Sequence, residues 1–148
     1  FLATGIFLVP TLHISKVLAE RGDAAGLSES SKRKAERLAE EGAGSFRRAC
    51  EAGVNVALGT DAFIAEMHGT NARELELMME EGGLSAMEAI VAGTKNAAAC
   101  CLLDEQVGTL EAGKLADILV VDGNPLDDIT VLQDSERIAV YKEGSPVA

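Results

Sequence analysis

The sequence is poor in aromatic residues and in positive charge. Aromatics make up 3% of its 148 residues, and tryptophan is absent. Few side chains are therefore available on which nucleic-acid bases could stack. The 13 Lys and Arg residues are outnumbered by 24 Asp and Glu residues, which gives a formal net charge of -11. Such a surface repels phosphate backbones and anionic lipid, so we expect neither nucleic acid nor membrane as a partner.

Cysteine is also scarce, and its placement disfavours two kinds of site. Cys50, Cys100 and Cys101 form an odd set, and the last two are adjacent in an apolar helical pattern. This disfavours a disulfide framework, and the lack of a CxxC motif or Cys/His cluster disfavours a structural zinc site. No histidine is placed by sequence to activate Cys100, so we interpret it as a packing residue. We expect reduced thiols in a cytoplasmic protein.

Long apolar segments are missing as well. The longest apolar runs are too short to span a bilayer, and the opening Phe1–Val9 run has no basic flank typical of a signal peptide. An initiator methionine is absent, so we expect the chain to begin in mid-sequence. Hydrophobic residues nevertheless make up 47% and charged residues 25%, a balance typical of a chain that folds.

The first part of the sequence predicts a strand, a helix and a second strand. Ile6–Val9 is typical of a buried parallel strand, and residues 10–13 would form the loop at its carboxyl end. A helical pattern runs from Ser28, a candidate N-cap, to Gly53. Its apolar positions recur at three- and four-residue spacing and are Ala35, Leu38, Ala39, Phe46, Ala49 and Cys50. Val54–Leu58 follows as a second strand, and this order predicts a right-handed βαβ unit.

Helices and then a small β region are predicted further along. Residues 71–81 predict a helix that ends at Gly82-Gly83, with Leu75, Met78 and Met79 facing inward. A capping-box pattern at residues 85–88 opens a second helix that ends near Gly93, and residues 94–103 predict a third. Strands are predicted at residues 116–121 and 137–141. We expect two units, residues 1–105 and residues 106–148.

Three residues are candidates for a site. Asp61 directly follows Gly59-Thr60 at the end of the second predicted strand, where βα-barrels carry their chemistry, and a carboxylate there can bind a metal and accept a proton. The alternative is a helix N-cap or a loop aspartate. His13 and His68, the only histidines, each follow a strand end on the same predicted face as Asp61. They could line one pocket with it, or they could be structural or surface residues.

Gly108–Lys114 has the spacing of a phosphate-binding loop but lacks two features that such a loop needs. Leu115 stands where a Ser or Thr would bind magnesium, and a strand follows where a helix would have to hold the phosphate. We therefore do not expect a nucleotide site there.

Several motifs together resemble the amidohydrolase superfamily. Residues 9–12 (VPTL), 52–54 (AGV) and 58–61 (LGTD) resemble its last two barrel strands, closest to the imidazolonepropionase-like and Xaa-Pro or Xaa-Arg dipeptidase branch. Residues 88–96 resemble the family's helices after the barrel, and residues 108–126 (GTLEAGKLADILVVDGNPL) resemble its C-terminal signature. The resemblance covers nearly the whole chain.

The resemblance implies a fold, a cofactor and a reaction. The fold class is α/β, namely the C-terminal part of a (β/α)8 TIM-like barrel followed by a segment of a small β-sandwich. The implied cofactor is Zn²⁺ or another divalent metal. Asp61 matches the family's aspartate, which contacts the metal or its hydroxide and carries a proton to the leaving amine. The implied partners are a small-molecule or dipeptide substrate and the missing N-terminal part of the barrel, and we expect a homo-oligomer.

The chain also departs from the family pattern. It has no His-x-His pair, and the bridging lysine and the two histidines of the middle strands would lie upstream of Phe1. His13 and His68 do not fall on the family's metal-ligand positions and at most resemble substrate-contacting loop residues. Two functional classes follow: part of a metal-dependent hydrolase of a C–N bond in an amide, dipeptide or cyclic amide, or a non-catalytic segment that folds only with a partner segment.

Overall fold

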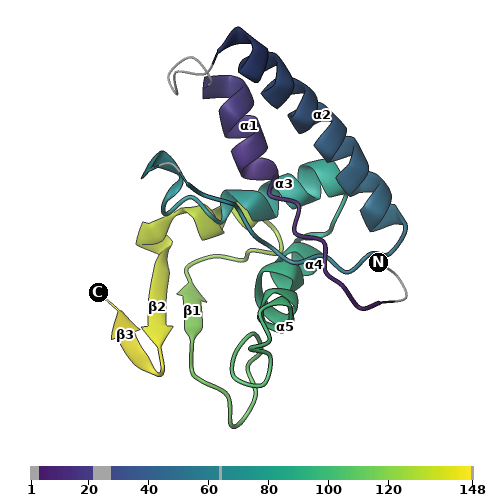
Figure 1. Cartoon of the computed structure of the whole chain (residues 1–148). Coiled ribbons are helices and arrows are strands. Elements are labelled where there is room, and N and C mark those ends of the chain that lie inside the picture. Colours follow the sequence, from purple (N-terminus) through teal and green to yellow (C-terminus); the bar gives the residue numbers. More distant parts are fainter. Residues whose placement is uncertain (1–3, 22–27, 64, 148) are drawn as a thin grey trace.

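The computed structural model describes residues 4–21, 28–63 and 65–147, and it is a mixed helical and sheet structure (Figure 1). The helices are α1 (Leu12–Arg21), α2 (Glu29–Glu51), the 3-10 turn η1 (Ala65–Met67), α3 (Arg73–Gly82), α4 (Ala86–Val91), the π-helical turn η2 (Ala92–Asn96), α5 (Ala97–Cys100) and the 3-10 turns η3 (Ile129–Gln133) and η4 (Ser135–Arg137). The strands are β1 (Ile118–Val121), β2 (Ile138–Lys142) and β3 (Ser145–Val147). No helix in the described ranges is long and apolar enough to cross a membrane.

The predicted parallel pairing of the first two strand segments is confirmed. Leu8 and Val56 form a parallel bridge, in which the Leu8 N–H donates to the Asn55 carbonyl at 2.8 Å and the Ala57 N–H donates to the Leu8 carbonyl at 3.0 Å. The pairing is one bridge rather than a ladder. Ile6 and Val9 are exposed, so the prediction that the whole first segment is buried was wrong.

The second segment also has its other edge occupied. The Leu58 N–H donates to the Ala92 carbonyl at 3.0 Å, and the Asn96 Nδ2 donates to the Val56 carbonyl at 2.8 Å. Both partners belong to η2. Alternate residues of a strand direct their backbone groups to opposite edges. The π-helical turn therefore takes the edge that does not face Leu8.

The continuous run from α4 through η2 to α5 corrects one prediction. The sequence predicted that a helix ends near Gly93, but the chain stays helical there. Gly93 is a point of close packing instead: a Cβ on it would lie 3.2 Å from Leu75 Cδ2 and 3.4 Å from Leu58 Cδ1.

The other predicted helices largely match, and one helix was missed. Ser28 caps α2 and Gly83 ends α3 in the left-handed conformation, while Ser85 opens α4 with the predicted capping box. Leu38 is exposed, although its spacing predicted an inward position. Residues 10–13 are not all loop, because α1 begins at Leu12.

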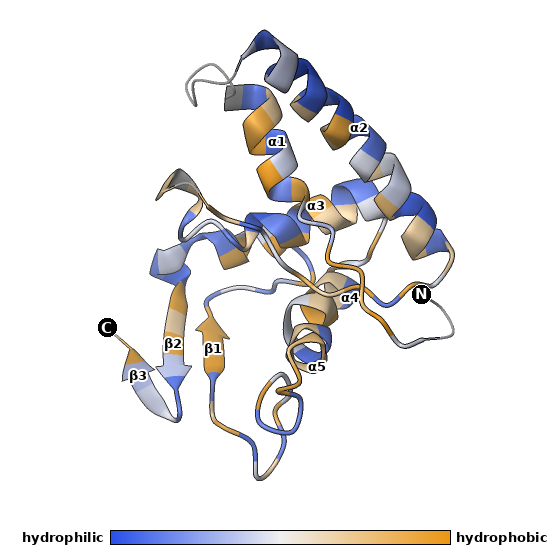
Figure 2. Cartoon of the chain, in the orientation of Figure 1, coloured by the Kyte–Doolittle hydropathy of each residue, from blue (hydrophilic) through white to orange (hydrophobic). Residues whose placement is uncertain are grey.

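The main core lies where α1, α2, α3 and the paired segments meet. Its buried residues are Leu12, Phe46, Val56, Leu77, Met78 and Ala92. Gly82 belongs to the same contact, since the Phe46 ring occupies the space that a Cβ on Gly82 would need. A second cluster joins α3 and α4 to η3, through Leu75, Ala86, Ala89 and Ile129. Figure 2 shows that α2 is mostly hydrophilic, with hydrophobic positions interspersed along it.

The C-terminal part is a three-stranded antiparallel sheet in the order β1-β2-β3. Val120 pairs with Ala139, and Val140 pairs with Val147. The first two strands match the predicted ones, and β3 was not predicted. Leu119, Val120, Val140 and Val147 are all exposed, so this sheet adds little to the core.

Candidate functional site

Asp61 lies just past the end of the second paired segment. A Cβ on Gly59 would lie 2.5 Å from Val9 Cγ1, so this position accepts only glycine while Val9 keeps its place. The ends of the two parallel segments are therefore in direct contact. Asp61 itself is exposed, and within the described residues its carboxylate has no hydrogen bond or ion pair. It does not cap α3, whose N-cap is Ala72.

The chain takes a positive φ shortly after each of the two paired segments. Thr11, two residues after Val9, has φ 49°, and Asp61, two residues after Gly59, has φ 50°. Residues other than glycine rarely adopt positive φ, and for a β-branched threonine the conformation is strained. Such residues cluster at functional sites, where surrounding contacts hold them. Leu102 and Glu143 also have positive φ, so it is the two turns together with the contact between Val9 and Gly59 that make this edge the candidate site.

Glu74 is the residue that sequence reasoning missed. Its carboxylate is 0% exposed, and its two oxygens accept the backbone N–H groups of Leu12 and His13, each at 2.8 Å. Burial raises the pKa of Glu74 above its ordinary value, and the hydrogen bonds from His13 and Leu12 oppose that rise. A signal was available: Glu74 precedes the inward residues Leu77 and Met78 by three and four positions, so it lies on the buried face of α3.

His13 lies in the first turn of α1, not in a loop as predicted, and it borders a cavity of about 220 Å³. The cavity is lined by His13, Lys16, Val17, Glu20, Met67, Thr70, Arg73 and Leu77. The His13 Nδ1 is buried and has no hydrogen-bond partner among the described residues. Burial lowers the pKa of His13, and the nearby Arg73 charge lowers it further while Glu20 opposes both. The imidazole is thereby held toward its neutral form.

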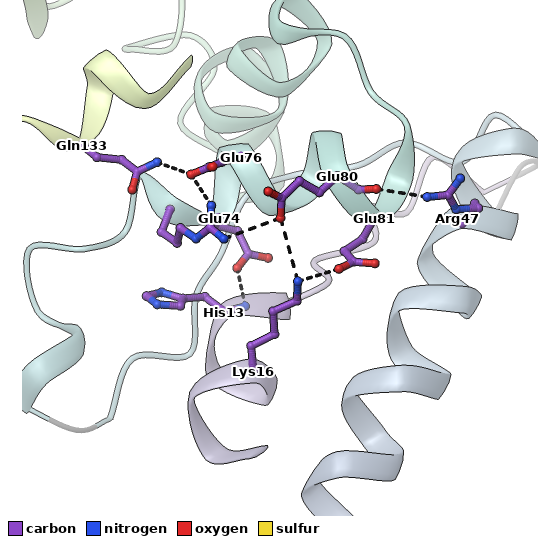
Figure 3. A network of polar contacts seen from close by, with 9 residues as sticks. His13, Lys16, Arg47, Glu74, Glu76, Glu80, Glu81 and Gln133 are labelled. Carbon is purple, nitrogen blue, oxygen red and sulfur yellow. Dashed lines mark hydrogen bonds and ion pairs between the residues drawn. The ribbon is translucent and has the colours of Figure 1, made fainter. Parts of the chain in front are cut away.

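Ion pairs link the helices around this cavity (Figure 3). Lys16 on α1 pairs with Glu81 at 2.6 Å and with Glu80 at 3.9 Å. Arg73 pairs with Glu76, which also accepts the Gln133 side chain, and the hydrogen bond from Arg73 lowers the pKa of Glu76. The network ties α1 and η3 to α3.

The structure does not join the three predicted site residues. His68 is exposed in the turn after η1 and does not line the cavity at His13. Across the described ranges, no hydrogen bond or ion pair connects Asp61, His13 and His68. A substrate-binding role for His13 and His68 stays a prediction.

The described residues do not complete a metal site. The described residues contain no group of three or more His, Cys, Asp or Glu side chains that could hold a metal ion. Catalytic zinc needs about three protein ligands. The free carboxylate of Asp61 could supply one oxygen, so the residues present do not form a metal site on their own.

Known proteins are similar in sequence to nearly the whole chain. The sequence matches the amidohydrolase family model over residues 1–147. Ochratoxinase of Aspergillus niger is 36% identical over 143 residues, which cover 95% of this chain and 29% of that protein. Imidazolonepropionase of Thermoplasma acidophilum is 33% identical over 94 residues, covering 64% of this chain and 23% of that protein.

Solved structures are similar to this chain in both fold and sequence. A Xaa-Pro dipeptidase with methionine bound in its active site superposes with a TM-score of 0.87 at 35% identity, over 99% of this chain and 35% of the dipeptidase. A prolidase complexed with N-methylphosphonate-L-proline gives 0.85 at 34% identity, over 97% of this chain and 35% of that chain. The present chain thus spans about a third of the length of these relatives. It belongs to the amidohydrolase family.

Proposed function

We propose that Asp61 is the proton-transfer carboxylate of an enzyme that hydrolyses a C–N bond. The observation that carries this proposal is the geometry at Asp61. It is an exposed carboxylate without a partner among the described residues, held at φ 50° directly after a strand end that packs against its parallel neighbour. A carboxylate that no protein cation neutralises is free to accept a proton from a ligand.

In the proposed reaction, water attacks the carbonyl carbon of the substrate and Asp61 accepts one of its protons. The C–N bond then breaks, and Asp61 delivers that proton to the leaving nitrogen. The products are a carboxylic acid and an amine, and the carboxylate returns to its starting form. One group thus acts first as base and then as acid.

The wider setting of this step is also a proposal. The family resemblance implies a (β/α)8 barrel and a divalent metal, to which Asp61 would contribute one oxygen. The remaining barrel strands and ligands would come from protein outside this chain, so the steps above involve only Asp61. The dipeptidase and the prolidase among the relatives support a dipeptide as substrate.

A second candidate is a non-catalytic segment that folds only with a partner segment. The exposed apolar residues of the sheet, such as Leu119 and Val140, favour it. Genomic sequence separates the two candidates. A continuous reading frame upstream of Phe1 that encodes His-x-His and two further histidines supports the enzyme, whereas a start codon directly upstream supports the partner-dependent segment.

Replacement of Asp61 by asparagine tests the proposed role. Asp61→Asn keeps the size of the side chain but removes its basic oxygen. In the active protein that contains this chain, kcat should fall by about 10²–10⁴-fold, the usual worth of general acid–base participation. KM should change far less, because the proton transfer belongs to the transition state.

The matched control is Asp117→Asn, since Asp117 bonds to Lys142 and to the Glu143 N–H in the sheet, where no site is proposed. Its turnover should stay near that of the wild type. Metal content must be measured on each sample. If Asp61→Asn keeps more than about a tenth of wild-type kcat at full metal content, Asp61 is a loop residue and the proposal is wrong.

A further inference from the structure

We propose that Glu74 is a positioning residue of the candidate site, which holds the first turn of α1 and the strand end before it in place beside Asp61. This inference deepens the proposed function, and its kinetic part rests on that function. Its structural part does not, because it concerns the backbone of residues 9–13 and can be measured without any substrate.

Glu74 caps the N-terminus of α1, although the two are far apart in the sequence. The first N–H groups of a helix have no partner within the helix. Here Oε1 accepts the Leu12 N–H and Oε2 accepts the His13 N–H, from a residue more than 60 positions away in the sequence. A negative group is electrostatically favoured at this end of a helix. Glu74 therefore caps α1 and fixes its start against α3.

A carboxylate is not what packing alone would select at this position. Glu74 is fully buried, and desolvation of a carboxylate costs free energy that an apolar side chain of similar length would avoid. The neighbouring Glu76 and Glu80 of α3 instead direct their charges to Arg73 and Lys16 near the surface. What Glu74 adds over an apolar residue is the fixed position of two backbone N–H groups.

That position is linked to Asp61 through the backbone of residues 9–12 and one packing contact between Val9 and Gly59. Leu12 follows the strained Thr11, and Val9 lies two residues before Thr11. The Val9 side chain fills the space beside Gly59, two residues before Asp61. Release of α1 would let residues 9–13 move, and the loop at Asp61 would lose its packing partner. The hydrogen bond from the His13 N–H to Glu74 also fixes the backbone of His13, a residue that lines the cavity.

Two variants of the active protein separate positioning from stability. Glu74→Met keeps the length of the side chain and removes both acceptors. Glu74→Gln keeps one acceptor and turns an NH2 group toward the second N–H. The control is Glu36→Gln, exposed on α2 and without a side-chain hydrogen bond or ion pair among the described residues. Hydrogen exchange of the Leu12 and His13 amides, the melting temperature, kcat and KM are measured for all three and for Asp61→Asn.

We expect Glu74→Met to melt within a few degrees of the wild type and to exchange the Leu12 and His13 amides at least about tenfold faster. Its kcat should fall about tenfold or more, because a small misplacement of a reacting group can cost up to about a hundredfold in rate. Glu74→Gln should lie between wild type and Glu74→Met, and KM should change less than kcat. Glu36→Gln should match the wild type in exchange and turnover.

The inference is overturned if Glu74→Met exchanges the Leu12 and His13 amides at the wild-type rate and keeps the wild-type kcat. A loss of kcat that merely follows the loss of folded protein, or failure of both variants to fold, also overturns it, because Glu74 would then serve folding alone. If the proposed function is wrong, Asp61→Asn keeps its turnover. Hydrogen exchange in the Glu74 variants still shows whether Glu74 of α3 holds the start of α1 in place.

Discussion

The helical region (residues 4–21, 28–63 and 65–101) and the sheet region (residues 116–121 and 138–147) use their apolar residues differently. Leu77 and Met78 in α3 are 0% exposed, whereas Leu119 in β1 is 56% exposed. Both regions show clear apolar patterns in the sequence. Such a pattern therefore predicts the type of an element, while the number of neighbouring elements decides whether its side chains are buried.

The two regions also differ in the range of their hydrogen bonds. The sheet is held by ladders between neighbouring strands. The helical region depends on side chains that reach far along the sequence, such as Glu74 to Leu12 and Asn96 to Val56. The candidate site lies in the region of long-range contacts, which can hold strained turns such as those at Thr11 and Asp61.

The largest expected difference between the two regions is the effect of losing a leucine side chain. Leu77→Ala leaves a cavity in the main core and should lower the free energy of unfolding by about 2–5 kcal/mol. Leu119→Ala removes the same atoms from an exposed site and should cost less than about 1 kcal/mol. Denaturant unfolding of both variants checks this. Equal losses would show that another surface covers the sheet in solution.

A smaller effect is expected at the contact between the strand ends. Gly59→Ala puts a methyl group against Val9 and should cost about 1–3 kcal/mol, the usual range for overpacking. Val9→Ala in the same protein should recover part of that loss by making room. A double-mutant cycle on unfolding free energies measures the coupling. Strictly additive effects would mean that residues 9 and 59 are not in contact.

Local signals predicted much of the fold. Ser28, Gly83 and the Ser85 capping box act within a few residues of the helices that they delimit, so the sequence alone places α2, α3 and α4. The order of the elements predicted that residues 6–9 and 54–58 lie parallel, and the bridge between Leu8 and Val56 confirms it. Missed features have distant causes, since the cap of α1 is Glu74 and the packing partners of Gly93 are Leu75 and Leu58.

The candidate site was predictable only in part. Asp61 stands out because Gly59-Thr60 and a strand precede it, and these signals are local. Glu74 is one glutamate among several in a charged helix, and its contact depends on how α1 meets α3. We expected Asp61, His13 and His68 to share a face because each was predicted to follow the end of a strand. The helical start at Leu12 moves His13 to the cavity between α1 and α3 instead.

The smallest effects concern pH, and here the two regions should respond with opposite sign. Burial raises the pKa of Glu74 in the helical region, whereas the hydrogen bond from Lys142 lowers the pKa of Asp117 in the sheet region. A raised pKa in the folded state means that the stabilising contribution is complete at pH below the ordinary value and is lost as pH rises through the raised value. A lowered pKa means that the contribution is present above the ordinary value and is lost as pH falls through the lowered one.

The difference in unfolding free energy between wild type and Glu74→Gln should therefore shrink as pH rises above the ordinary glutamate pKa of 4.5. The difference between wild type and Asp117→Asn should shrink as pH falls below the ordinary aspartate pKa of 3.8. The second change should be the smaller, because Asp117 is exposed and its pairing is screened by solvent. Denaturant unfolding across a pH series measures both slopes. A Glu74 difference that grows with pH would mean that its two hydrogen bonds outweigh its burial, and that the carboxylate stabilises the fold as well as positioning α1.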